Sequence, residues 1–97
     1  MALFIIERGF AEQLDVAPEL IQAVEDYNGG AGLRWLFSFL SADGKKGYCL
    51  YEAPNADALR AQAASLGLPA DAIVEVSEVN PAVLNGGAGV TSHAMRF

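Results

Sequence analysis

The sequence predicts one α+β domain in which two helices cover one face of a four-stranded antiparallel sheet. The first observation is a strong hairpin signal in Gly32–Pro54, where Asp43-Gly44 joins two apolar runs. The second is a pair of segments with helical spacing, one before and one after this hairpin. The third is the resulting order of strand, helix, strand, strand, helix, strand, which is the βαββαβ order of ferredoxin-like folds.

The first strand is predicted over Ala2–Arg8, ALFIIER. Side chains alternate across a strand, so one face carries Leu3, Ile5 and Glu7 and the other carries Phe4, Ile6 and Arg8. Both faces are apolar until the last two residues, which favours a central strand covered on both sides.

The first helix is predicted over Pro18–Tyr27, PELIQAVEDY, with apolar residues at helical spacing and Pro18 in the first turn. Asn28-Gly29-Gly30 is expected to end it, because Asn and Gly accept the left-handed conformation of a helix C-terminus.

The hairpin strands follow, as LRWLFSFLS and GYCLYEA. Simple alternation directs one set of side chains away from the helices, together with Glu7 of the first strand: Trp35, Phe37, Phe39, Cys49 and Tyr51. Large exposed apolar surfaces usually mark contacts, so we expect a homodimer joined through this sheet face, with any ligand pocket inside the contact.

The second helix is predicted over Asn55–Leu66, with Asn55 as N-cap, Gly67 as C-terminal stop, and a buried stripe of Leu59, Ala63 and Leu66. The last strand is predicted over Ala72–Val79. Residues 1–79 therefore form the domain. Residues 80–97, rich in Gly and Ala, are expected to be an irregular tail.

Composition narrows the classes of partner. The 97 residues carry a formal charge of −6, which argues against binding nucleic acid or an anionic membrane. The longest apolar runs are far short of the roughly 20 residues that span a bilayer. The single cysteine forms no internal disulfide, and the N-terminus has no signal-peptide pattern, so we expect a cytoplasmic location.

Four segments, taken together, resemble a small bacterial domain-of-unknown-function family that includes a nickel-binding protein and has a dimeric ferredoxin-like fold. These segments are Glu7-Arg8 followed by Phe10, Trp35–Phe39, Tyr48–Pro54, and Gly67-Leu68-Pro69 followed by Ile73 and Glu75-Val76. The resemblance implies a non-enzymatic binder of a metal ion, with nickel the first to test, or of a small ligand.

The candidate metal ligands are Glu7 and Cys49, with Trp35, Phe37 and Tyr51 as walls of a ligand site. Phe37 and Phe39 stand where members of the family commonly have His and Tyr. A phenyl ring coordinates no metal, so we expect nickel binding to be weak or absent here.

Several other interpretations stay open. Glu7 can form an ion pair at the sheet rim, Cys49 can be a small buried hydrophobe, and His93 can be solvated. The fold also hosts cofactor-independent monooxygenases and isomerases, which predicts an apolar pocket near Glu7 with that carboxylate as proton acceptor. A structural interaction module would fill the aromatic face completely with the partner subunit.

Overall fold

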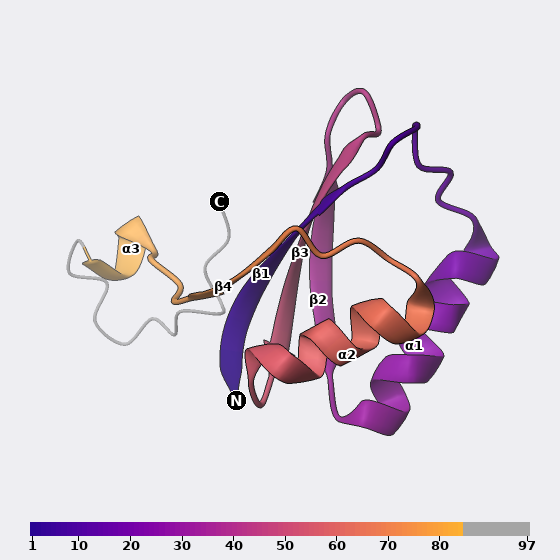
Figure 1. Ribbon diagram of the computed structural model, residues 1–97. Coiled ribbons are helices and arrows are strands. Elements are labelled where there is room, and N and C mark those ends of the chain that lie inside the picture. Colours follow the sequence, from indigo (N-terminus) through magenta and orange to yellow (C-terminus); the bar gives the residue numbers. More distant parts are fainter. Residues whose placement is uncertain (85–97) are drawn as a thin grey trace.

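A computed structural model describes residues 1–84 of the chain (Figure 1). Four strands and three helices follow one another: β1 (Ala2–Gly9), α1 (Pro18–Ala31), β2 (Arg34–Leu40), β3 (Lys46–Ala53), α2 (Ala56–Leu66), β4 (Ala72–Val76) and the short α3 (Pro81–Leu84).

The strands form one sheet in the order β2-β3-β1-β4, and all three pairs are antiparallel. β1 and β3 are therefore the central strands, which confirms the prediction made for β1. Helices α1 and α2 lie together on one face of the sheet, where they contact β2, β3 and β4 (Figure 1). The predicted ferredoxin-like α+β fold is confirmed.

The core lies between the sheet and α2. Phe4 and Ile6 of β1 pack with Tyr51 of β3 and with Leu59 of α2, and all four side chains are buried. Leu33 and Ala53 complete the cluster. Burial of these apolar surfaces supplies most of the driving force for docking the helix on the sheet.

Helix α1 runs further than the sequence indicated. Asn28-Gly29-Gly30 does not end the helix, which continues to Ala31 and is capped by Gly32 at φ 70°. Asn28 is buried in the helix, where Gln62 donates a hydrogen bond to its side-chain oxygen at 2.8 Å. Tertiary contact therefore overrides the local preference of this segment.

Helix α2 follows the prediction closely. Asn55 caps it by accepting a hydrogen bond from the Ala58 amide at 2.9 Å, and Gly67 ends it at φ 65°. Its Leu59 and Ala63 are buried, while Leu66 is half-buried.

The end of the chain differs from the prediction in two places. Strand β4 ends at Val76 rather than Val79, and Pro81–Leu84 forms a helical turn at the start of the predicted irregular tail. Asn80 begins this turn by accepting a hydrogen bond from the Ala82 amide at 3.0 Å. The rest of that tail, including His93, lies outside the described residues.

A β-bulge in β2 changes which side chains face the helices. Trp35 pairs with Tyr51 and Phe37 pairs with Leu50, so Leu36 is an extra residue between them. The strand therefore changes phase: Trp35 lies on the helix side, whereas Phe37, two residues later, lies on the opposite side.

The expected aromatic face is also wrong in composition because of the register between β1 and β3. Cys49 and Tyr51 pair with Ile6 and Phe4, which are core residues, so both point toward the helices and not away from them. The face without helices, which we call the open face, carries Leu3, Ile5, Glu7, Phe37, Phe39, Tyr48, Leu50 and Val74.

No helix within residues 1–84 combines the length and apolar character needed to cross a membrane.

Candidate functional site: an apolar cavity with a buried arginine

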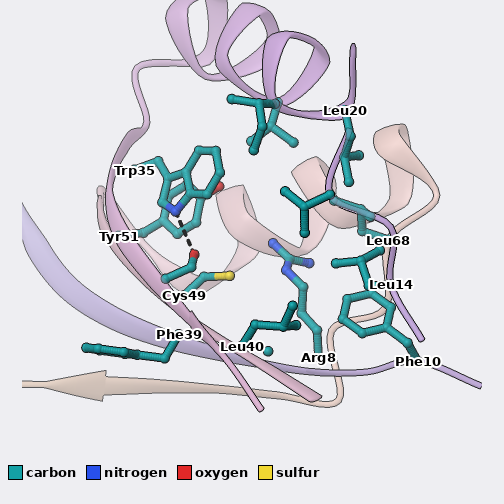
Figure 2. A pocket seen from close by; sticks show the side chains of 15 residues that line it. Arg8, Phe10, Leu14, Leu20, Trp35, Phe39, Leu40, Cys49, Tyr51 and Leu68 are labelled. Atoms are coloured by element: carbon teal, nitrogen blue, oxygen red, sulfur yellow. Dashed lines mark hydrogen bonds between the residues drawn. The ribbon is translucent and has the colours of Figure 1, made fainter. Parts of the chain in front are cut away.

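A cavity of about 120 Å³ lies on the helix side of the sheet, beneath α1 (Figure 2). For comparison, an apolar cavity of about 150 Å³ holds one benzene molecule. Most of its lining is aliphatic or aromatic, and among residues 1–84 no acidic side chain belongs to it. The lining residues are Arg8, Phe10, Leu14, Val16, Leu20, Ile21, Val24, Trp35, Ser38, Phe39, Leu40, Gly47, Cys49, Tyr51 and Leu68.

The lining is graded from buried to exposed. Arg8, Val24 and Tyr51 are buried, whereas Val16 and Leu40 are exposed. The lining therefore extends from the buried core to residues at the molecular surface.

Arg8 brings a charge into this apolar space. It lies on β1 in phase with Phe4 and Ile6, and only 4% of its surface is exposed. Its guanidinium donates hydrogen bonds to the Pro69 carbonyl at 2.7 Å and to Gln62 Oε1 at 3.1 Å. Figure 2 shows the guanidinium pointing away from the strand into the space near Cys49, Leu14 and Leu68.

Gln62 of α2 holds that guanidinium in place. Its side chain is fully buried, and its Nε2 donates to Asn28 Oδ1 and to the Tyr51 hydroxyl, both at 2.8 Å. Every polar atom of this amide therefore has a partner, as a buried amide requires. The network joins β1, α1, β3 and α2 beneath the cavity.

Two aromatic rings form one wall. Trp35 stacks on Tyr51 with ring centroids 6.3 Å apart, and the Trp35 Nε1–H donates to Ser38 Oγ at 2.8 Å, the dashed line of Figure 2. Burial raises the pKa of the Tyr51 hydroxyl above its ordinary value, although its hydrogen bonds and the nearby Arg8 act in the opposite direction. The hydroxyl is therefore neutral at neutral pH.

The segment between β1 and α1 closes another side, through Phe10, Leu14 and Val16. It is fixed to the hairpin turn, because the Phe10 amide donates to the Lys45 carbonyl and the Leu14 amide to the Gly44 carbonyl, both at 2.8 Å. Gly44 sits at φ 73°, where glycine is favoured over other residues. The turn thus positions a cavity wall.

Glu7 is on the other side of the sheet. It pairs with Tyr48 across β1 and β3, and it forms an ion pair with Lys46, Nζ to Oε1 at 3.0 Å. The hydrogen bond and charge of Glu7 raise the pKa of Lys46. The rim ion pair, one of the open interpretations, is the arrangement observed. Glu7 does not line the cavity, so the pocket expected near Glu7 is not this one.

The predicted site residues are therefore divided between two surfaces. Trp35, Cys49 and Tyr51 line the cavity, whereas Glu7 and Phe37 lie on the open face. The prediction that Glu7 and Cys49 share a face is wrong, because Cys49 pairs with Ile6 and not with Glu7. The pair cannot ligate one metal ion within the chain.

No other metal centre replaces that pair in the described part of the chain. Within residues 1–84, no three His, Cys, Asp or Glu side chains are gathered closely enough to hold a metal ion. These donors do not fit a resident nickel ion.

Sequence reasoning missed Arg8 and Gln62 as residues of the site. For Arg8 the signal was its phase with Phe4 and Ile6, which places a guanidinium on the core face of a central strand. For Gln62 the signal was its spacing of three residues from Leu59 in the apolar stripe of α2.

The fold and the cavity define a small ferredoxin-like α+β protein with a ligand-sized space between sheet and helices. A similar solved structure is the crystal structure of SCO4226 from Streptomyces coelicolor A3(2), which has a TM-score of 0.68 and 22% sequence identity. The similarity covers 77% of this chain and 95% of that one, and at this identity it supports the fold alone.

The family is established by sequence. The model of the nickel responsive protein SCO4226-like family matches residues 4–76, and the chain belongs to this family. The resemblance noted from the sequence is thereby confirmed. A comparison with curated proteins gives no match.

Proposed function

We propose that this protein is a non-enzymatic binding protein whose small, mainly apolar ligand occupies the cavity beneath α1. The observation that carries the proposal is an apolar cavity with the buried, charged Arg8 in its lining. Binding sites for small molecules are typically apolar hollows with a few polar groups that fix orientation.

Nickel is the ligand that the family's description suggests. A nickel role for this chain stays a prediction, and the donors of residues 1–84 give it no centre. We therefore assign the cavity to an organic ligand and test nickel separately.

We also propose that the protein is a homodimer joined through the open face. Phe37 and Val74 are 46% and 54% exposed there, and Tyr48 is exposed beside them. Leu3, Ile5 and Leu50 add half-buried apolar surface between these side chains. A second copy would remove this surface from water, and the symmetry of a dimer lets one face serve both subunits.

The ligand site is tested with small aromatic probes. Trp35 is the sole tryptophan and lines the cavity, so its fluorescence reports occupancy. We expect benzamide and benzoate to change this fluorescence saturably and to shift the amide resonances of the lining residues. Ligands of this size should bind in roughly the millimolar range.

A blocked cavity provides the control. Cys49→Phe fills the space and should abolish probe binding, while Leu50→Phe, the next residue but on the open face, should leave it intact. The proposal fails if neither probe binds the wild-type protein, or if Cys49→Phe is folded and binds both unchanged.

A further inference from the structure

Arg8 has no carboxylate partner within residues 1–84. The ion pairs of this part of the chain are Arg34 with Glu52, Lys46 with Glu7, and Arg60 with Asp57, all with exposed or half-exposed groups. Lys45 is exposed to solvent. Arg8 is the buried cation, and a buried charge is unfavourable unless it is compensated.

The groups that meet Arg8 are neutral. The Pro69 carbonyl and the Gln62 amide oxygen accept two of the five N–H groups that a guanidinium carries. A chain of hydrogen bonds leads from Arg8 through Gln62 to Asn28, whose Nδ2 is 3.5 Å from the exposed Glu25. Two intervening amides separate that charge from Arg8, so the guanidinium keeps both charge and donors for another partner.

Ser38 adds a second donor to the lining. Its Oγ accepts from Trp35, which leaves the hydroxyl proton available, whereas the Tyr51 hydroxyl is already engaged by Gln62 and Asn28. No Asp or Glu of the described part of the chain lines the cavity. The wall of this space is almost entirely apolar, and the Arg8 guanidinium is its charged group, so it favours an apolar ligand with one anionic group over a cation or a neutral molecule.

Taking the cavity to be the ligand site proposed above, we propose that its ligand is an apolar monocarboxylate whose carboxylate binds Arg8. The aliphatic and aromatic walls accept a body of about one aromatic ring by volume, as the comparison with benzene indicates. The hydrogen bonds of Gln62 and Pro69 fix the guanidinium before the ligand arrives, which reduces the entropy lost on binding.

The test compares benzoate with benzamide, which have nearly the same shape but differ in charge. We expect benzoate to bind the wild-type protein about tenfold or more tightly, because hydrogen bonds to charged groups contribute more than neutral ones. Benzoate, and not benzamide, should also shift the side-chain resonances of the Arg8 guanidinium.

Two variants test whether the preference for benzoate over benzamide depends on Arg8. Arg8→Met keeps the length of the side chain and removes the charge, so the ratio of the two affinities should fall to about one. Arg34→Met removes an exposed arginine that is outside the cavity and should preserve the ratio. If Arg8→Met does not fold, the assignment is still tested by the ratio of benzoate to benzamide affinity in the wild-type protein and by the shifts of the Arg8 side-chain resonances.

The outcomes separate the two proposals. If both probes bind wild-type protein with equal affinity, the cavity is a ligand site but the carboxylate assignment is overturned. Persistence of the benzoate preference in a folded Arg8→Met variant overturns it as well. If neither probe binds, the proposed function fails and this assignment fails with it.

Discussion

The indole of Trp35 stacks on the ring of Tyr51, with centroids 6.3 Å apart and planes within 7° of parallel. The contact joins an outer strand to a central one across the helix side of the sheet. Tyr51 is buried in the core, while Trp35 is half-buried at the cavity. The stacked pair therefore packs the cavity wall directly against the core.

The buried hydroxyl of Tyr51 should make stability fall at alkaline pH. Its pKa is raised in the folded protein, chiefly by burial, so the unfolded chain releases this proton first as pH increases past about 10. The unfolded state then binds fewer protons than the folded state, and the free energy of unfolding decreases with rising pH.

Urea unfolding at a series of alkaline pH values measures whether the free energy of unfolding decreases as the pH rises. Tyr51→Phe should show a shallower alkaline loss than the wild type, whereas Tyr48→Phe, at the exposed Tyr48, should retain the full loss. A Tyr51→Phe profile parallel to that of the wild type would contradict the prediction.

Gln62→Ala should be strongly destabilising. The change removes hydrogen bonds to Arg8, Asn28 and Tyr51 and leaves buried polar groups without partners, for a loss of about 2–4 kcal/mol in the free energy of unfolding. Gln22→Ala removes one exposed hydrogen bond, to Asp26, and should cost less than about 0.5 kcal/mol. Chemical denaturation of both variants measures the difference, and equal effects would show that the buried network contributes little.

Gly44→Ala should destabilise the turn that holds the cavity wall. Gly44 has φ 73°, and an added Cβ would lie 2.6 Å from Gln13 Cγ. The left-handed conformation alone costs a residue with a side chain about 1–2 kcal/mol.

Gly29→Ala is the matched control. It lies within α1 with no heavy atom near an added Cβ, and should raise stability by about 0.5–1 kcal/mol. Opposite signs of the two changes in the free energy of unfolding are the expected result, and a neutral Gly44→Ala would contradict it.

A negative charge on the open face should prevent dimer formation. Phe37→Asp and Val74→Asp each place an unpaired carboxylate in the proposed contact, and sedimentation equilibrium should report monomers. Ala64→Asp, on an exposed position of α2, should remain dimeric. A wild-type protein that is monomeric in the same experiment would contradict the proposed homodimer.

Nickel uptake should not depend on the two residues first considered as ligands. Because Glu7 and Cys49 lie on opposite sides of the sheet, Glu7→Ala and Cys49→Ala should each bind as many nickel ions as the wild type in native mass spectrometry. Loss of an ion in either variant would restore that residue as a ligand.

Local signals predicted the fold well because they act over a few residues. Asn55 and Gly67 cap α2 as expected, and Asp43-Gly44 forms the hairpin turn. The C-terminus of α1 was mispredicted because a contact distant in sequence, between Gln62 and Asn28, decides it.

The site was predicted only in part, for a different reason. Trp35, Cys49 and Tyr51 do come together at one cavity, but alternation assigned them to the wrong side of the sheet. The extra residue Leu36 is invisible to a pattern of period two, since Trp35, Phe37 and Phe39 alternate in sequence without interruption. A charged residue on the core face, Arg8, was the stronger indication of a site.

The bulge at Leu36 also lets strand β2 contribute side chains to two separate surfaces. Trp35 before it lines the cavity, whereas Phe37 after it lies on the open face, although only two positions separate the two residues. Replacement of Phe37 would thus remodel the outer surface and spare the inner one. A substitution at Phe37 can therefore alter the proposed subunit contact without altering the wall that Trp35 gives the cavity.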